Sequence, residues 1–475
     1  MNYRLFCKLL CAFFVGVFYT AAAYATSDFL EESFRIAFAR NQQIRVAEDQ
    51  INLSRIRVTN AMRQFFPQVV LQTQQSQGRT AITTDINTGH FVREEYRAES
   101  LGIRAIQPVF DGFRTSGMLQ HERLMLEAAR INLTRQREEL RTSIKLAYYE
   151  YLTLKVEYRA LGQAFLEVER LWLRSQNELR ARAISELDLF EAENFRDKVQ
   201  DMLTAARINL NFAMRRLAEI VGVTSLEDIG ATVSDELPDD IPEIAFSLQD
   251  CINFALTNNL ELITARIMIE MSHARRVMGR SRVLPSFHVE AFYGRSGEAF
   301  VTEPLRLTST WALAGRLSWG FWGNSLAAGL STDRTQPSTI IDASRRVENT
   351  TIDVSVSILD DLNHFIDARE TDVNIRQTQA DLQDLVRRTR LTVERAYNEY
   401  RNSLNNARTL RNEIRLRERR LALLRMRNEL FEVPTLALME ESWRFAEAIT
   451  NYSRATFLNH SSVTELESLT LMPLR

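Results

Sequence analysis

The sequence is poor in residues that interrupt helices, in cysteine and in long apolar runs. Its 475 residues include 16 glycines, 9 prolines and 3 cysteines, and so few glycines and prolines indicate long helices. Beyond residue 25 no apolar run reaches 18 residues, which excludes a bundle of membrane-spanning helices but not the weaker alternating pattern of membrane strands. A net charge of −2 excludes binding to nucleic acid through bulk positive charge.

The motifs that begin most enzyme mechanisms are missing as well. The 6 histidines are scattered without ligand spacing, and no second cysteine stands near them. The patterns GxGxxG, GxxxxGK(S/T) and GxSxG are absent, so neither nucleotide use nor serine hydrolysis has a starting point. We therefore expect no enzyme, no metal and no cofactor, and a partner must supply any energy that the protein's work needs.

The segment 1–25 is predicted to be a secretory signal peptide. Arg4 and Lys8 precede an apolar run that ends in the small-residue pattern Ala23-Tyr24-Ala25. The run is shorter than the ~20 residues that cross a bilayer, so a membrane anchor is the weaker interpretation. Its removal would leave Cys251 as the only cysteine and exclude an internal disulfide.

The rest of the chain is one unit repeated twice. Residues 30–67 align without a gap with residues 248–285, and Asn41 falls on Asn259. Acidic residues and prolines separate the two copies, as is typical of a connector. The predicted divisions are a first repeat at 26–222, an acidic connector at 223–247 and a second repeat at 248–475.

Each repeat is predicted to run helix, strand, strand, very long helix, shorter helix. In the very long helices Ala147, Leu154 and Leu161 recur at seven-residue intervals, as in a coiled coil, and Val393 and Tyr400 repeat this spacing. The predicted helices are 28–64, 111–182 and 185–222, then 248–282, 361–432 and 435–470. The predicted strands are about 67–78 and 99–109, then about 285–297 and 350–360. A further strand-like segment at 309–322 is interpreted as an extra hairpin arm or an external loop.

The strands are predicted to cross a lipid bilayer at one end of antiparallel pairs of helical columns. Alternating segments of about ten residues have the length of membrane strands, and a water-soluble β-cap is the alternative. Aromatic residues near the strand ends are expected at the membrane interface, namely Phe65, Phe66, Phe110, Phe113, Trp311, Trp319 and Trp322. Four strands per chain cannot close a barrel, so the chain must oligomerise, either as a dimer with eight strands or as a trimer with twelve.

Several short motifs resemble the TolC family of outer-membrane efflux and secretion channels. The motifs are residues 34–41 and 252–259 in the first helix of each repeat, Phe66-Pro67 and Leu284-Pro285 before the strands, and Gln107 to Gly112 before the first long helix. The resemblance implies a mainly helical homotrimer, with a twelve-stranded β-barrel in the outer membrane of a Gram-negative bacterium and a coiled-coil helical barrel in the periplasm. It also implies two partners, a periplasmic adaptor protein and an inner-membrane pump or ABC exporter.

The resemblance further implies functional residues at the tips of the two helical hairpins. The family pattern of an aromatic residue, a glycine and an acidic residue falls on Phe431, Pro434 and Glu440 in one tip, and on Leu179, Arg182 and Asp188 in the other, without the glycine. Asp188, Glu440 and Glu441 would then form rings of negative charge around a periplasmic aperture, which bias a pore toward cations. Arg182 could close that aperture by pairing with Asp188 of a neighbouring chain. The alternative is that these acidic residues only favour a helix N-terminus.

The predicted function is passive conduction of substrates to the exterior in a tripartite efflux or type I secretion system, gated by movement of the hairpin tips. The alternative is a non-conducting periplasmic coiled-coil tether that is anchored in the outer membrane. Because a wide duct needs no fitted pocket, no local motif identifies the substrate.

Overall fold

The computed structural model describes most of the chain as two compact units. The described residues are 29–79, 83–84, 91–92, 95–229, 241–300, 304–321, 323–335, 347–358, 363–430 and 432–474. The helical unit comprises the described parts of Met1–Glu48, Ile131–Ile263 and Asp384–Arg475, and the strand unit those of Asp49–Arg130 and Thr264–Gln383. The predicted signal peptide, residues 230–240 of the predicted connector, Trp322 and Phe431 lie outside the described residues.

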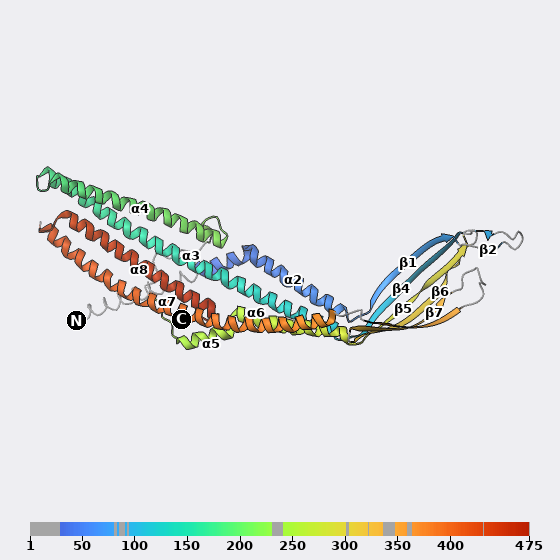
Figure 1. Ribbon diagram of the computed structural model, residues 1–475. Coiled ribbons are helices and arrows are strands. Elements are labelled where there is room, and N and C mark those ends of the chain that lie inside the picture. Colours follow the sequence, from blue (N-terminus) through green and yellow to red (C-terminus); the bar gives the residue numbers. More distant parts are fainter. Residues whose placement is uncertain are drawn as a thin grey trace, which may run out of the picture. The chain divides into compact units, whose positions relative to one another are not determined.

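Helices make up most of the described chain (Figure 1). They are residues 29–40, α2 (Gln42–Arg63), α3 (Arg114–Arg180), α4 (Glu186–Val221), α5 (Leu248–Asn258), α6 (Leu260–Arg280), α7 (Asn363–Glu429) and α8 (Thr435–Thr470), with short 3-10 helices η1 (Leu226–Ile229) and η2 (Ser281–Val283). The two longest, α3 and α7, have 67 residues each. At 1.5 Å per residue each is about 100 Å long.

The helices expected at 28–64 and 248–282 are each interrupted at an asparagine, which corrects the sequence interpretation. The side-chain oxygens of Asn41 and Asn259 accept hydrogen bonds from the backbone amides two and three residues on, at 2.8 and 3.2 Å for Asn41 and at 2.9 and 3.2 Å for Asn259. Each asparagine therefore begins a new helix in the manner of an N-cap. Helical periodicity could not show the break, because the apolar positions continue across it.

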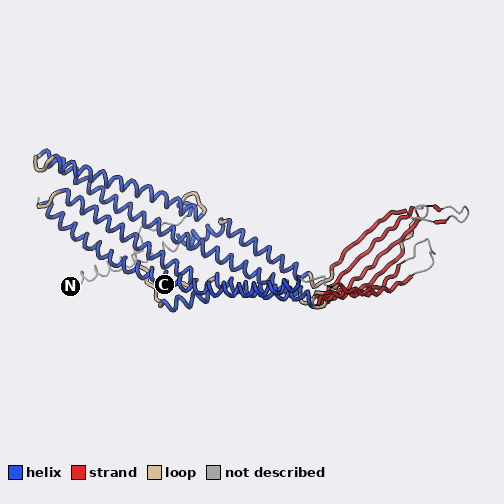
Figure 2. The backbone as a smooth tube through the Cα atoms, in the orientation of Figure 1, coloured by secondary structure: helices blue, strands red, loops and turns tan. Residues whose placement is uncertain are grey.

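Six strands form one antiparallel sheet, so the expected count of four strands per chain is wrong (Figure 2, red). In sheet order they are β1 (Gln68–Arg79), β4 (Glu95–Asp111), β5 (Ser286–Phe300), β6 (Thr308–Phe321), β7 (Asn324–Thr335) and β8 (Val347–Ser357), and β2 (Thr83–Thr84) pairs separately with β3 (Phe91–Val92). The segment expected at 309–322 is one arm of the β6–β7 hairpin. The other arm, β7, is rich in Ser, Ala and Gly, which have weak strand preference, so its sequence gave little signal.

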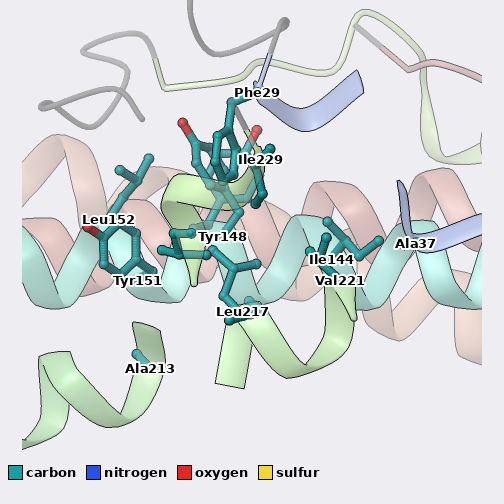
Figure 3. Packing of buried hydrophobic residues seen from close by; sticks show 14 residues of the cluster. Phe29, Ala37, Ile144, Tyr148, Tyr151, Leu152, Ala213, Leu217, Val221 and Ile229 are labelled. Carbon is teal, nitrogen blue, oxygen red and sulfur yellow. The ribbon is translucent and has the colours of Figure 1, made fainter. Parts of the chain in front are cut away.

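The helical unit is packed along seams with seven-residue spacing. On α4 the buried side chains at this spacing are Ala192, Val199, Ala206 and Ala213. Such small side chains let neighbouring helices approach closely. At one end of the unit the Phe29 ring stacks on Tyr148 of α3, with 5.1 Å between the ring centroids, and Leu217 and Val221 of α4 belong to the same cluster (Figure 3).

The passage from β4 into α3 requires unusual backbone geometry. Gly112 and Phe113 have φ angles of 65° and 70°, in the left-handed region. A Cβ atom on residue 112 would lie 2.7 Å from the backbone oxygen of Ser281, so only glycine fits there. The Asp111 carboxylate then accepts a hydrogen bond of 2.7 Å from the Thr115 amide and caps the first turn of α3. The sharp change from sheet to helix in the strand unit is therefore specified locally.

Candidate functional site

The six-stranded sheet has one apolar face. Residues paired across antiparallel strands lie on the same face, and Leu71, Ile103, Tyr293 and Trp311 are paired in succession from β1 to β6. The face also carries Val69, Leu101, Val289, Leu313, Leu317, Leu330, Ile352, Val354 and Val356. These side chains are not covered: Leu71 is 74% exposed and Ile352 73%. Water-soluble monomers rarely expose a continuous apolar surface of this kind, so the face requires an apolar partner.

The opposite face of the sheet is mostly polar or small. It carries Gln72 and Gln74 on β1, Thr351, Asp353 and Ser355 on β8, and several Ala, Ser and Thr residues on the strands between them. Arg104 of β4 and Glu290 of β5 form an ion pair on it, with 3.2 Å between nitrogen and oxygen. Val70, Ile106 and Phe292 are apolar exceptions on this second face. A sheet with one apolar face and one mostly polar or small face is the pattern of a wall between lipid and water.

Both outer strands of the sheet are left with an unpaired edge in the described chain. β1 pairs only with β4, and β8 pairs only with β7. The two strands have 12 and 11 residues, so each presents a long row of free backbone donors and acceptors. Such edges pair readily with another chain.

Four of the predicted interface aromatics lie where the strands meet the helices. Phe65 and Phe66 precede β1 and are 46% and 67% exposed. Phe110 and Phe113 follow each other across the β4–α3 junction, with ring centroids 5.3 Å apart in an edge-to-face arrangement. The side-chain amide of Gln107 donates to the Phe65 backbone oxygen at 3.1 Å and ties these two junctions together.

Two of the three predicted tryptophans, Trp311 and Trp319, lie near opposite ends of β6. The Trp319 indole donates a hydrogen bond of 3.2 Å to the backbone oxygen of Val283, next to the helices. Trp311 is eight residues away along the strand, which is about 27 Å. Aromatic residues at both ends of an apolar band are typical of membrane strands. Their position at a membrane interface stays a prediction.

The tip between α3 and α4 contains Arg182 and Asp188. Arg182 has a φ of 58° and therefore lies in the left-handed region. In the TolC-family tip pattern this position is the glycine, which adopts that conformation readily. Asp188 forms a capping box with Ser185: its carboxylate accepts bonds from the Ser185 amide at 2.9 Å and hydroxyl at 2.8 Å, and the hydroxyl accepts from the Asp188 amide at 3.2 Å. These hydrogen bonds hold the pKa of Asp188 below its usual value. Within one chain Asp188 thus acts as a helix cap, and its pairing with Arg182 of another chain stays a prediction.

Arg182→Gly is expected to stabilise this tip by about 1 kcal/mol, because glycine adopts the left-handed conformation without the penalty that a side chain pays. The midpoint of thermal unfolding in detergent is the measurement. Arg180→Gly is the matched control, since Arg180 is the last residue of α3 and glycine in a helix costs up to about 1 kcal/mol. A lower midpoint for both variants would contradict the left-handed assignment.

Ser185→Ala is expected to weaken the start of α4 by about 1 kcal/mol and to reduce its pH dependence. The folded pKa of Asp188 is lowered, so the cap's stabilisation is present above the unfolded pKa and is lost as pH falls through the folded pKa. Protection of the first amides of α4 against hydrogen exchange should therefore fall on acidification in the parent and change less in the variant. The equivalent Ser247–Asp250 box of α5 is an internal control and should be unaffected. Equal pH dependence at α4 in both chains would refute the capping account.

Glu440 and Glu441, near the tip between α7 and α8, were both expected at the aperture, but their side chains have different surroundings. Glu440 is partly exposed and pairs with Arg444 one turn along α8 at 3.5 Å. Glu441 is 2% exposed and pairs with Arg417 at 3.3 Å and with Arg420 at 3.4 Å on α7. Successive residues of a helix point about 100° apart, so Glu441 faces α7 while Glu440 does not. The place of Glu441 in an aperture ring stays a prediction. Pro434 is the N-cap residue of α8 and makes no side-chain capping bond.

A network of hydrogen bonds, which the sequence did not reveal, joins the two tips. We define the tip network as Arg174, Glu178, Asn428 and Thr435. The Arg174 guanidinium donates to Asn428 Oδ1 at 2.9 Å and to its backbone oxygen at 3.3 Å, and it pairs with Glu178 at 2.8 Å. The Thr435 hydroxyl donates to the Glu178 carboxylate at 3.1 Å. Charge-assisted bonds of this kind fix one hairpin against the other.

The tip network was missed because its partners are more than 250 residues apart in sequence. One signal was present: Asn428 falls seven residues after Leu421, at a seam position where an apolar residue is the rule. Asn428 is only 3% exposed, and its amide also donates to the Val433 backbone oxygen at 2.9 Å. A polar residue on an apolar seam therefore marked the contact between the tips.

Among the described residues, none of the helices combines the length and apolarity that crossing a membrane requires. In that same part of the chain no three His, Cys, Asp or Glu residues cluster in a way that could hold a metal ion.

Comparisons with known proteins give matches by structure alone. No family model matches the chain. No curated protein matches its sequence. The outer-membrane channel OprN superposes with a TM-score of 0.69 at 14% identity, over 94% of this chain and 91% of that one. The CmeC outer membrane channel of Campylobacter jejuni gives 0.68 at 12% identity, over 93% and 85%.

The open-state MtrE outer membrane channel of Neisseria gonorrhoeae is similar to the same extent, with a TM-score of 0.66 at 13% identity over 94% of this chain and 89% of that one. These three neighbours are channels and not enzymes. The chain therefore has the fold of outer-membrane channels, and its predicted resemblance to the TolC family is confirmed at the level of architecture.

Proposed function

We propose that the chain forms an outer-membrane channel through which substrates leave the periplasm passively. The observation that carries this proposal is the two-faced sheet, apolar and uncovered on one side and polar on the other, with unpaired edges at β1 and β8. In lipid, an unpaired edge leaves backbone groups unsatisfied at several kcal/mol each, so the wall must close. One chain cannot close it, and pairing of β8 with β1 of the next copy does.

We propose a homotrimer, and the helical unit supports closure by several copies. α7 buries one seam that includes Val393, Tyr400, Ala407 and Leu421. It leaves Leu416 and Leu423, which have the same seven-residue spacing on a second seam, exposed by 65% and 56%. A helix in a closed ring must contact a neighbour on each side, which requires two seams. The second seam fits a neighbouring copy, and a ring of such columns forms the periplasmic tunnel.

We propose that the tunnel opens at the hairpin tips. The tip network holds the two hairpins of one chain together, and a periplasmic adaptor with an inner-membrane pump or ABC exporter would supply the energy to separate them. Glu440 and Asp188 remain the candidates for charged rings at the opening. The reversal potential of a Glu440→Gln channel tests this, since an unchanged cation preference would remove Glu440 from the opening.

Recordings from purified protein in planar lipid bilayers test the proposed function. Stepwise ionic currents are expected, and they should be absent when the same sample is heat-denatured before addition. A folded, membrane-bound protein that carries no current would contradict the channel and favour the coiled-coil tether.

A further inference from the structure

The β6–β7 hairpin is built into the sheet along its whole length. β6 pairs with β5 from Ser286–Ser318 at one end to Ser296–Thr308 at the other. β7 pairs with β6 from Asn324 to Arg334, and with β8 from Ser325 to Thr335. Neither strand lies at an edge of the sheet, so the hairpin is part of the sheet and not an external loop.

The hairpin is not needed to return the chain to the helices. β5 leaves the helices, and β8 comes back to them, because each neighbouring pair in the order β5, β6, β7, β8 is antiparallel. Without β6 and β7 the remaining strands β1, β4, β5 and β8 would still alternate correctly. The hairpin therefore adds width to the wall and changes nothing else in the topology.

The side chains of the hairpin suit a wall that encloses open space. On the apolar face it carries Trp311, Leu313, Leu317, Leu326 and Leu330. On the polar face its residues are mostly small, among them Ala312, Ala314, Ser318, Ser325, Ala327, Gly329 and Ser331. A narrow barrel fills its interior with bulky side chains, whereas these would leave the interior free.

We propose that the β6–β7 hairpin widens the outlet, so that three copies close an eighteen-stranded barrel. This rests on the proposed trimer. With strands about 4.8 Å apart and tilted about 40°, eighteen strands enclose a backbone diameter of about 36 Å, and twelve strands one of about 24 Å.

The wider outlet bears on the class of cargo. A polypeptide helix is about 10–12 Å across, so it would pass an outlet with a backbone diameter of about 36 Å without contact on all sides. The outlet therefore places no size limit on small compounds or on extended and helical polypeptide. Selection of cargo then falls to another part of the protein, and the tip network is the candidate.

Distances between spin labels on the three copies test this inference. Thr73 is exposed and lies on the apolar face of β1, where it pairs with Leu101. Thr73→Cys therefore places one label per chain on that face, in a background in which the native cysteines are replaced by serine. Equivalent positions on an eighteen-stranded trimer are about 31 Å apart at the backbone, against about 21 Å for twelve strands. In the matched variant, residues 301–346 are replaced by Asn-Gly, which joins β5 to β8 by a two-residue turn. Double electron–electron resonance in detergent measures the distance between labels in the parent and in the variant. The label adds the same length to both distances.

The inference expects the distance to shorten by about 10 Å in the variant. A distance of about 21 Å in the parent, or an unchanged distance in the variant, would show that the hairpin does not widen the barrel. Either result would leave the proposed trimer intact. If labelled chains show no distance between copies, the proposed trimer fails as well. Should the variant not fold, the parent distance alone decides between eighteen and twelve strands.

Discussion

Arg174→Ala should convert a channel that is mostly closed into one that is open far more often. The substitution removes both hydrogen bonds from the Arg174 guanidinium to Asn428 and the ion pair with Glu178. Hydrogen bonds to charged groups contribute about 1.5–3 kcal/mol each when buried, and the Arg174 side chain is 33% exposed, so we expect a loss of about 2 kcal/mol. Since 1.4 kcal/mol is a factor of ten, the ratio of open to closed states should rise by about 30-fold. Single-channel open probability is the measurement.

Arg180→Ala is the matched control for this experiment. Arg180 lies on the same helix close to the tip, and its side chain makes a marginal contact of 3.5 Å with Asn177 on its own helix. Arg174→Lys keeps the charge but loses the planar fork, so it should open the channel to an intermediate extent. Equal open probability in the Arg174→Ala and Arg180→Ala channels would show that the tip network does not hold the tunnel closed.

Leu71→Arg should prevent stable insertion into the membrane, whereas Gln72→Arg should be tolerated. The two residues are neighbours on β1, but Leu71 lies on the apolar face and pairs with Ile103, while Gln72 lies on the polar face and pairs with Gly102. An arginine on the lipid face of a membrane barrel costs about 2–4 kcal/mol near the midplane, and a trimer carries three of them. The amount of folded protein recovered in lipid vesicles is the measurement.

The comparison within one strand removes the effects of charge and of strand propensity, because both variants introduce the same residue. Loss of insertion for Gln72→Arg, with Leu71→Arg unaffected, would reverse the assignment of the two faces. Equal recovery of both would mean that neither face of the sheet contacts lipid.

Periodicity was enough to predict the long helices. Of the predicted seam residues, Ala147 and Leu161 on α3 and Val393 and Tyr400 on α7 are buried in the structure, and Leu154 is partly buried. A seam of this length is specified by many residues, and no single exception disturbs it. The predicted helix 111–182 and the observed α3 (Arg114–Arg180) accordingly differ by only two or three residues at each end.

Features that depend on one residue or on distant partners were harder to predict. The breaks at Asn41 and Asn259 depend on the hydrogen bonds of a single side chain, and β7 has too few β-branched and aromatic residues to mark it as a strand. The burial of Glu441 depends on which side of α8 faces Arg417, which a turn pattern does not specify. The tip network depends on folding that brings Glu178 to Thr435.

The central claim is that the apolar face of the sheet contacts lipid and that its wall closes only between copies. Native mass spectrometry of the purified chain in detergent measures the number of copies directly. The account predicts particles of three chains that require detergent to stay in solution. A monodisperse single chain that remains soluble in buffer without detergent would contradict it.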